Sequence, residues 1–547
     1  MLSNLIDHTP SAYSYPLLIK QLLHTPLAVA PEQEIVYRDK IRYNYWTLRH
    51  RIGQLASGLS ALGAKRGDTV AMMDWDSHRY LESYFAVPMM GAVLMTVNVR
   101  LAPEQIAYTL NHSGANVLLV NADFIPVLDQ IKGQLESVDR FILIDDTDSV
   151  PTPPGFSGVY EAMLAAGSPD FVFEDFDENT RATTFYTTGT TGLPKGVYFS
   201  HRQLVLLALS VAAALGSAGS QGRVHRDDVY MPLTPMFHVH AWSIPFVATL
   251  LGLKQVYPGR YAPDLLLELI GREKVTLSHG VPTIVNMILT HPDAERTDLN
   301  GWKVIVGGSA LPQSLAEAAL KRGIDIFAGY GMSETGPIMS VSQVKTPLLA
   351  NPGRALELRT RAGLPLPLVD LRIVDPDMRD VARDGETTGE IVVRAPWTTQ
   401  GYFKNPEASE ALWAGGYLHT NDIGVIDGDG YLQITDRLKD VIKTGGEWVS
   451  SIELEDLILR HPAVGEAAVI GVKDDKWGER PLAIVVLKPG EEVDVETIRG
   501  HVAQFVGAGT ISKFAVPERI LFVTELEKTS VGKLNKKALR KRYGNMP

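Results

Sequence analysis

Short apolar runs alternate with longer amphipathic stretches through most of the chain, which is the pattern of a layered α/β protein. The runs are rich in Val, Ile and Leu and have the length of buried strands. In the first third of the chain, the runs at 117–120 and 141–144 predict strands. The same alternation returns near residue 183, with an expected strand at 302–306, a helix at 313–322 and a strand at 324–328.

After residue 370 the pattern changes to short strands separated by turn signals such as the DGDG sequence at 427–430. A tail of about 110 residues, the size of a separate domain, follows from residue 437. In this region we expect strands at 371–374, 390–394, 430–434, 440–443, 467–472 and 482–487, and helices at 452–460 and 495–505. The sequence therefore predicts a large multi-layer α/β N-terminal body (1–436) and a small α+β C-terminal cap (437–547), joined by a hinge at 436–440.

Composition and charge narrow the class of protein. Of the 547 residues, 45% are apolar and 21% are charged, which is typical of a globular protein with enough apolar material for large cores. The net charge of −11 argues against nucleic-acid binding, which needs a basic surface. The chain contains no cysteine, which excludes disulfides, thiolate metal ligands and a cysteine nucleophile.

We expect a cytoplasmic protein without a transmembrane segment. The first 18 residues lack the basic start and the apolar core of a signal peptide. The most apolar run, at 204–216, is shorter than the ~20 residues that a membrane-spanning helix needs.

The most informative segment is the loop at 186–196, which reads YTTGTTGLPKG. Apolar residues on both sides predict strands, so we expect the loop to join two strands. Its glycines allow close approach of the backbone and let N–H groups face an anion. Its threonines add hydroxyl donors, and Lys195 adds a positive charge. The spacing is not that of a Walker A motif, yet these features together predict a polyphosphate-binding loop.

This loop resembles the phosphate-binding signature of the superfamily of AMP-forming acyl-CoA synthetases, adenylation domains and luciferases. Segments similar to the other signatures of that superfamily follow in its usual order: PMFHVHAW at 235–242, YGMSET at 330–335, YLHTND at 417–422, DRLKD at 436–440 and KTSVGK at 528–533. The resemblance covers nearly the whole chain and implies an enzyme that activates a carboxylic acid with ATP. The stretch 422–450 most resembles medium- or long-chain fatty acid–CoA ligases of the kind found in bacterial alkane degradation.

The resemblance implies roles for individual residues around the nucleotide. Glu334 and Thr187 would hold Mg²⁺, a hard cation that prefers oxygen ligands. Tyr330 would stack on adenine, and Asp422 would accept hydrogen bonds from both ribose hydroxyls. The implied catalytic residues are Lys195, His238, Glu334 and Lys533. Further residues implied to contact ATP or AMP are Thr187, Thr188, Gly189, Thr190, Thr191, Gly192, Gly308, Ser309, Gly331, Met332, Thr335 and Arg437.

For the acid, the resemblance implies a pocket in which Trp242 is the gate to a fatty-acid tunnel. The implied pocket residues are His238, Trp242, Gly280, Val281 and Gly308. His238 and Trp242 are four residues apart, so in a helix they would share one face. We assign no catalytic role to His240 or His279, and no histidine pair has the spacing of a metal-binding HExxH motif.

The same resemblance implies two conformations of the small domain. Lys533 would serve the first reaction, and rotation about Lys439 would then admit coenzyme A. The remaining residues implied to lie along the path of coenzyme A are Lys443, Gly445, Gly446 and Trp448.

The function implied is therefore a fatty acid–CoA ligase that uses ATP, Mg²⁺ and coenzyme A. Two alternatives stay open. One is an adenylate-forming ligase that passes its acyl group to a carrier protein or another acceptor, and the other is a CoA ligase for an aromatic or thioether acid. A luciferase-like oxygenase is a more distant reading, and the resemblance is compatible with a homodimer.

Overall fold

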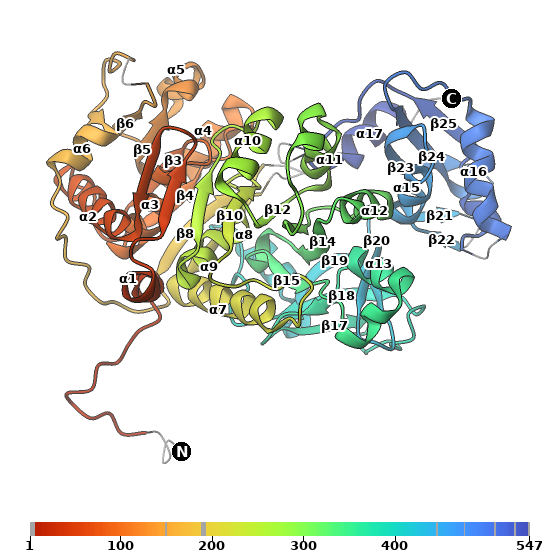
Figure 1. The fold of residues 1–547 in the computed structure, drawn as a ribbon, viewed down its shortest axis with the longest axis horizontal. Helices are drawn as coiled ribbons and strands as arrows, with labels where there is room; N and C mark the ends of the chain where they lie inside the picture. Colours follow the sequence, from red (N-terminus) through yellow and green to blue (C-terminus); the bar gives the residue numbers. More distant parts are fainter. Residues whose placement is uncertain are drawn as a thin grey trace.

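A computed structural model of the chain describes residues 6–147, 150–187, 193–444, 447–474, 476–507, 510–529 and 532–544. The N-terminal part is built on three sheets, and the C-terminal part (blue in Figure 1) has a sheet of its own and lies at one end of the molecule. This arrangement confirms the predicted α/β body with a small α+β C-terminal domain. Within the described ranges, no helix is both long enough and apolar enough to cross a membrane.

Two large, mostly parallel sheets form the N-terminal part. In spatial order the first contains β7 (Gly158–Val159), β6 (Arg140–Ile144), β5 (Ala115–Asn121), β3 (Thr69–Met73), β4 (Val93–Thr96), β8 (Arg181–Tyr186) and β9 (Gly196–Ser200). The second contains β16 (Leu364–Pro365), β15 (Ile338–Val341), β14 (Asp325–Gly331), β13 (Lys303–Val306), β12 (Leu277–Gly280), β10 (Val229–Leu233), β11 (Lys254–Tyr257), β1 (Glu34–Tyr37) and β2 (Ile41–Asn44).

Both sheets are buried on both faces, which gives five layers. Along β3, Val70 and Met72 join the apolar core shared by the two sheets, whereas Ala71 and Met73 join a separate outer core, because successive side chains of a strand point to opposite faces. The shared core contains α3 (His78–Met89), α7 (His201–Ser217) and α9 (Ile244–Leu251). The outer layers contain α4 (Pro103–Ser113) and α5 (Ile125–Ile131) on one side, and α10 (Pro263–Glu273), α11 (Pro282–Thr290) and α12 (Gln313–Lys321) on the other.

Two smaller sheets complete the protein. An antiparallel sheet contains β17 (Asp370–Val374), β18 (Gly389–Arg394), β19 (Leu418–Ile426) and β20 (Leu432–Arg437). The C-terminal sheet contains β21 (Ile442–Thr444), β22 (Glu447–Val449), β23 (Val464–Asp474), β24 (Gly478–Leu487) and β25 (Arg519–Phe522), and it packs with α15 (Ser451–Leu459), α16 (Val495–Gly507) and α17 (Lys536–Tyr543). Further helices of the N-terminal part are α1 (His24–Val29), α2 (Tyr45–Ala61), α6 (Tyr160–Ala166), α8 (Val239–Trp242), α13 (Pro352–Thr360) and α14 (Pro406–Leu412).

The elements predicted from the hydrophobic pattern are confirmed with shifts of a few residues at their ends. The expected strand at 117–120 is β5, and the expected helix at 313–322 is α12. In the tail, the expected helices at 452–460 and 495–505 are α15 and α16. The apolar run at 204–216 lies in α7, which packs in the layer between the two large sheets.

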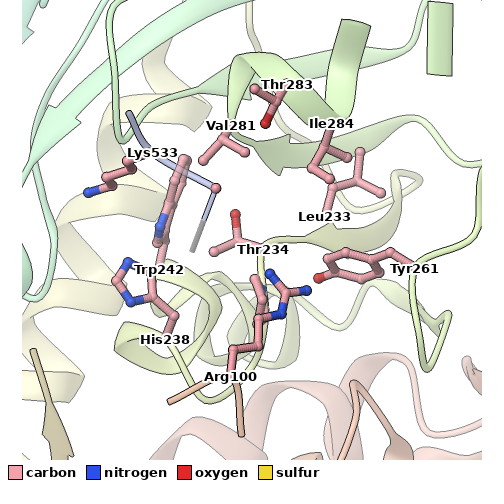
Figure 2. A pocket seen from close by; sticks show the side chains of 12 residues that line it. Arg100, Leu233, Thr234, His238, Trp242, Tyr261, Val281, Thr283, Ile284 and Lys533 are labelled. Carbon is pink, nitrogen blue, oxygen red and sulfur yellow. The ribbon is translucent and has the colours of Figure 1, made fainter. Parts of the chain in front are cut away.

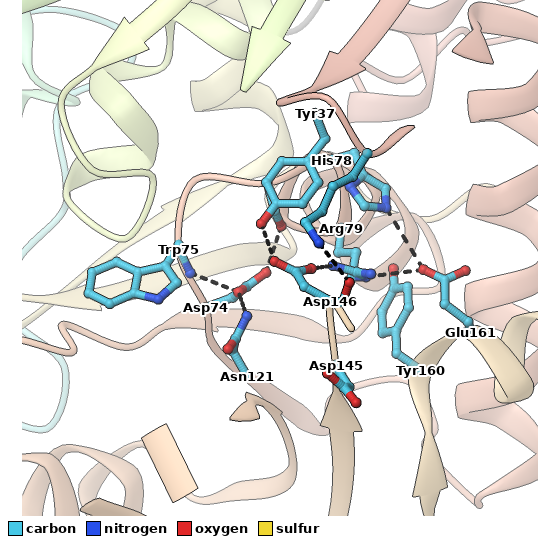
Figure 3. Close-up of polar contacts among 12 residues, drawn as sticks. Tyr37, Asp74, Trp75, His78, Arg79, Asn121, Asp145, Asp146, Tyr160 and Glu161 are labelled. Carbon is cyan, nitrogen blue, oxygen red and sulfur yellow. Dashed lines mark hydrogen bonds and ion pairs between the residues drawn. The ribbon is translucent and has the colours of Figure 1, made fainter. Parts of the chain in front are cut away.

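A buried network of charged and polar groups ties several N-terminal elements together (Figure 3). Arg79 on α3 donates to Asp146, 2.7 Å away, and to Glu161 on α6, 3.0 Å away. Tyr37 on β1 donates its hydroxyl to Asp146 at 2.5 Å. Because Arg79 is only 4% exposed, its carboxylate partners compensate a charge that water cannot reach.

Candidate active site

The Thr/Gly/Lys loop joins β8 to β9, as predicted, where the two strands pair antiparallel and Tyr186 lies opposite Gly196. At its base, the Thr187 N–H donates to the Lys195 carbonyl (2.9 Å), and the Lys195 N–H donates to the Thr187 hydroxyl (3.2 Å). These bonds fix the two ends of the loop close together. The predicted nucleotide contacts Thr188, Gly189, Thr190, Thr191 and Gly192 lie outside the described residues.

Glu334 follows β14 in a single helical turn and is buried. The Tyr402 hydroxyl donates to its carboxylate at 2.6 Å. Burial raises the pKa of Glu334, against the opposing effects of the Tyr402 hydrogen bond and of the Lys195 and Lys533 charges. Tyr402 also places its ring 4.5 Å from the Lys195 ammonium, so one side chain contacts both the carboxylate and the lysine.

The main-chain turn around Glu334 is held by its neighbours. Thr335 is buried, and its hydroxyl bonds the main chain at Met332 (3.0 Å) and Pro337 (2.5 Å). At Gly331 an added Cβ would lie 1.5 Å from the Pro337 carbonyl oxygen, so only glycine fits there. These residues thus shape the turn that presents Glu334.

Asp422 on β19 lies at the edge of the same region. It accepts a hydrogen bond from the Tyr330 hydroxyl at 2.9 Å and pairs with the Arg437 guanidinium at 3.2 Å. Burial raises the pKa of Asp422, and the charges of Arg437 and Lys533 oppose the rise. The motifs at 330–335, 417–422 and 436–440, which are far apart in the chain, therefore meet in space.

Lys533 reaches this region from the C-terminal domain. Its main chain forms a tight turn with Thr529, whose N–H donates to the Lys533 carbonyl at 2.7 Å. The lysine stem lies against Gly308, where an added Cβ would come within 2.9 Å of the Lys533 Cε. Gly308 also has a left-handed φ of +81°, so glycine is required for two reasons.

Burial is the main cause of the low pKa of Lys533. Burial lowers the pKa of Lys533 to about 8, and Arg437 adds to the effect, whereas Asp422 and Glu334 oppose it. The positive charges of Lys195 and Lys533 both lower the pKa of Glu334, and Tyr402 contacts both Lys195 and Glu334. The strand-linking loop and the distant terminal lysine therefore both lie near the Glu334 carboxylate.

Beside Lys533 lies a small cavity of about 30 Å³. Figure 2 shows Lys533, Trp242 and His238 on one side of it and Tyr261 on the opposite side. Burial lowers the pKa of His238 to about 3, with further contributions from Lys533 and Arg100, so its imidazole is neutral at pH 7.

The predicted acid-pocket residues cluster around this cavity. Val281 lines it together with Trp242. An added Cβ at Gly308 would lie 3.2 Å from Val281, and one at Gly280 would lie 3.2 Å from Leu233, which also lines the cavity.

The segment that carries His238 and Trp242 is not the right-handed helix that would place them on a common face. Five consecutive residues from Val239 to Ser243 have left-handed φ values between 47° and 60°. The left-handed conformation costs L-residues roughly 1–2 kcal/mol each. The turn is closed by the Ser243 N–H bond to the His240 carbonyl (3.0 Å) and braced by the Ser243 hydroxyl, which donates to the Gly336 carbonyl at 2.8 Å. His238 and Trp242 reach the cavity through this turn.

A second and larger cavity, of about 1510 Å³, separates the N-terminal body from the C-terminal domain. Ser309 and Tyr330 line it on one side, and Glu453 and Lys528 line it on the other. The nucleotide region thus opens into the space between the two parts.

The predicted hinge and coenzyme A residues lie near the start of the C-terminal part. Lys439 falls between β20 and β21, and Lys443 lies on β21, where its N–H donates to Glu479 at 2.9 Å. Gly445 and Gly446 lie outside the described residues, as does the side chain of Trp448.

Sequence reasoning missed several residues of the site. Tyr402 contacts Glu334 and Lys195, and Thr234 and Arg100 line the small cavity. No motif contains Tyr402 or Arg100, and Thr234 directly precedes one. Only their proximity to the site in the folded chain reveals these three residues.

Comparison with known proteins identifies the family. The protein-family model described as "AMP-binding enzyme" matches residues 23–403. A second family model, described as "AMP-binding enzyme C-terminal domain", matches residues 453–533.

Relatives cover almost the whole chain. A long-chain-fatty-acid–CoA ligase of Thermus thermophilus is 42% identical over 531 residues, which are 96% of this chain and 95% of the relative. A 3-methylmercaptopropionyl-CoA ligase of Ruegeria lacuscaerulensis is 36% identical over 96% of this chain and 97% of its own. A medium-chain-fatty-acid–CoA ligase of Ectopseudomonas oleovorans is 35% identical over 91% of this chain and 90% of its own.

Solved structures show the same architecture. The anthranilate CoA ligase AuaEII in complex with anthranoyl-AMP aligns with a TM-score of 0.85 at 25% identity, over 96% of this chain and 98% of its own. ATP-bound MatB from Rhodopseudomonas palustris aligns with a TM-score of 0.82 at 25% identity, over 97% and 99% of the two chains. These matches confirm the resemblance found in the motifs, and the chain belongs to the AMP-binding enzyme family as an AMP-forming acid–thiol ligase.

Proposed function

We propose that the chain is a fatty acid–CoA ligase, which converts a medium- or long-chain acid and ATP into acyl-AMP and pyrophosphate, and then transfers the acyl group to coenzyme A. The observation that best supports this proposal is the position of Lys533, which reaches from the C-terminal domain to Gly308. There it lies close to Glu334 and Asp422 and lines a cavity that Trp242 also lines. The 42% identity to a long-chain-fatty-acid–CoA ligase supports the acid class.

In the first step, a carboxylate oxygen of the acid attacks the α-phosphorus of ATP. A new oxygen–phosphorus bond forms while the bond from that phosphorus to pyrophosphate breaks, and pyrophosphate leaves with the electron pair. Negative charge is dense in this transition state, so cations and oriented donors matter more than a general base. Lys533 and Lys195 supply positive charge, the loop at 186–196 supplies N–H and hydroxyl donors, and neutral His238 orients the acid.

The hydrogen bonds around Asp422 support its proposed role, and that of Tyr330, in binding the nucleotide. Asp422, already held by Tyr330 and Arg437, is positioned to accept the ribose hydroxyls, and Tyr330 offers its ring to adenine. Gly308 and Ser309 follow β13 and would lie beside the nucleotide, as expected where ligands bind beyond the carboxyl ends of parallel strands.

We propose that the Glu334 carboxylate and the Thr187 hydroxyl, both oxygen donors, hold Mg²⁺ together with the phosphates of ATP. Among the described residues no group of three or more His, Asp or Glu side chains could hold a metal ion by itself. One carboxylate together with substrate phosphates is a usual way for a protein to bind Mg²⁺. When bound there, Mg²⁺ would neutralise charge on the phosphates of ATP.

In the second step, the thiol sulfur of coenzyme A attacks the carbonyl carbon of the acyl-AMP. A carbon–sulfur bond forms, the bond from that carbon to the phosphate oxygen breaks, and AMP leaves with the electron pair while the thiol proton passes to phosphate or water. We propose that the C-terminal domain (437–547) rotates relative to the body (1–436) about Lys439. Lys443, Gly445, Gly446 and Trp448 would then face coenzyme A. Such a rotation gates the reaction and does not itself accelerate it.

A thioether acid is the second candidate substrate, because relatives from two Ruegeria species that are 36% and 38% identical are 3-methylmercaptopropionyl-CoA ligases. Pyrophosphate release measured across straight-chain, thioether and aromatic acids, with and without coenzyme A, tests both proposals. We expect the highest turnover with straight-chain acids and a thioester only when coenzyme A is present. A thioester-free product or a strict preference for another acid class would contradict the proposal. The cytoplasmic location and the homodimer stay predictions.

A further inference from the structure

Three aromatic rings stand in a row beside the acid cavity. The Trp242 indole contacts the His279 imidazole, with ring centres 5.0 Å apart, and His279 stacks on Tyr230 with ring centres 5.8 Å apart and an angle of 12°. The Tyr230 hydroxyl and the His279 Nε2 are joined by a hydrogen bond of 2.8 Å. All three side chains are buried.

The register of the sheet puts these rings at increasing depth. Val281 lines the cavity just beyond β12, and His279 lies two residues deeper along that strand, which corresponds to about 7 Å. Tyr230 on β10 pairs with Leu277, another two residues deeper and on the same face of the sheet as His279. The row Trp242–His279–Tyr230 therefore leads from the cavity into the core between the two large sheets.

An acyl chain needs more room than the cavity provides. A volume of about 30 Å³ has room for about two water molecules, far less than an acyl chain occupies. Trp242 fills the neighbouring space, since an added Cβ on Gly307 would lie 3.0 Å from the edge of its indole. A chain can therefore enter only if Trp242 moves, and the next side chain in its path is His279.

His279 is a poor surface for methylene groups to pass. Burial lowers its pKa to about 3, so the ring is neutral, and its Nδ1 has no hydrogen-bond partner among the described residues. Chain atoms pushed beyond it would have to displace the imidazole and break its bond to Tyr230, leaving buried polar groups unpaired at a cost of about 1–3 kcal/mol each.

We infer that His279, backed by Tyr230, is the floor of the acid pocket and limits the length of the acyl chain, so that medium-chain acids are activated in preference to long-chain acids. This inference rests on the proposed function, and it makes His279 a specificity-determining residue rather than a catalytic one.

The test compares the chain-length profile of the wild type with those of three variants. The assay is kcat/KM for pyrophosphate release with saturated straight-chain acids of 4 to about 16 carbons, in steps of two carbons, a spacing that resolves the roughly tenfold or greater effect of one methylene in an apolar pocket. His279→Ala removes the floor, His279→Phe keeps a ring of similar size without nitrogen, and Ser278→Ala is the matched control. Ser278 lies on the same strand but points to the other face, where it accepts a hydrogen bond from Trp302 at 3.1 Å.

We expect His279→Ala to shift the optimum to longer acids, with a gain of at least about tenfold for acids just above the wild-type limit. His279→Phe keeps a ring in the path but loses the bond to Tyr230, so it should shift the limit less than His279→Ala does, and Ser278→Ala should keep the whole profile. An unchanged profile in His279→Ala overturns the inference, as does an equal shift in His279→Phe. If His279→Ala does not fold, His279→Val carries the same expectation with a smaller shift.

The panel also separates this inference from the proposed function. If the wild type activates straight-chain acids and the chain-length profile is the same in His279→Ala, only the assignment of His279 as the floor is contradicted. A wild type that activates only aromatic acids contradicts the fatty-acid proposal. In that case the same variants are compared on phenyl-substituted acids of increasing length, and a shift toward longer ones in His279→Ala supports the floor, whereas no shift overturns it.

Discussion

Replacement of Lys533 by alanine tests how the two half-reactions are divided. The ammonium lies against Gly308 and close to Glu334 and Asp422, where the attacked phosphate would bind. Removing one oriented donor from such a transition state typically costs about 10²–10³ in kcat. We therefore expect Lys533→Ala to lose this factor in acyl-AMP formation. Thioester formation from supplied acyl-AMP should change little, because in the proposed mechanism the C-terminal domain rotates before that step.

The pKa of Lys533 adds a pH signature with a defined sign. Its pKa is lowered to about 8 by burial, so the lysine is charged below pH 8 and becomes neutral as the pH rises through that value. If only the charged form assists, kcat/KM for acyl-AMP formation falls roughly tenfold between pH 7 and pH 9, because kcat/KM reports the free enzyme. This fall should be absent in Lys533→Ala.

The two half-reactions are measured separately. Pyrophosphate release reports the first, and thioester formation from synthetic acyl-AMP and coenzyme A reports the second. Lys541→Ala, an exposed lysine on α17 of the same domain, is the control and should keep both rates. Equal losses in both half-reactions for Lys533→Ala would refute the domain rotation, and a pH limb that survives in that variant would refute the role of its charge.

Three further outcomes follow from the geometry. Trp242→Ala should change the acid chain-length preference and leave the KM for ATP within about twofold, since one methylene in a pocket is worth ~1–3 kcal/mol; an altered KM for ATP with an unchanged acid profile contradicts the gate. Glu334→Gln should lower acyl-AMP formation by about 10²–10³ and raise the Mg²⁺ concentration needed for half-maximal rate; an unchanged Mg²⁺ dependence contradicts its role. Arg79→Met should lower the free energy of unfolding in urea by about 1–3 kcal/mol, because the partly buried Asp146 and Glu161 each lose a charged hydrogen-bond donor, whereas the exposed Arg379→Met should cost less than about 1 kcal/mol; equal losses contradict the importance of the buried network.

Much of the fold is readable from the sequence because its strands are buried on both faces. A continuous apolar run such as 117–120 stands out from its amphipathic neighbours, and β5 lies there. The loop at 186–196 is also readable, since threonine, glycine and lysine between two strands have few uses other than anion binding. The position of Lys533 could be inferred only through its motif, because a lone lysine near the C-terminus is usually solvated.

The acid pocket could not be predicted in the same way. Residues 239–243 are Val, His, Ala, Trp and Ser, and apart from the histidine none of them is enriched in the left-handed region that all five occupy. Tertiary contacts such as the Ser243 bond to Gly336, 93 residues further along the chain, help to hold that conformation. The row of rings at Trp242, His279 and Tyr230 likewise depends on strand register, which local pattern does not reveal.

Acid-dependent formation of AMP is the most direct test of the convergence of the loop at 186–196 and Lys533 on one nucleotide. Purified protein is incubated with ATP, Mg²⁺ and a panel of organic acids without coenzyme A, and the nucleotide and phosphate products are quantified. We predict enzyme-bound acyl-AMP and pyrophosphate in equal amounts, and free AMP once coenzyme A is added. Formation of ADP and phosphate, or no acid-dependent product with any acid, would contradict the convergence of the loop at 186–196 and Lys533 on one nucleotide.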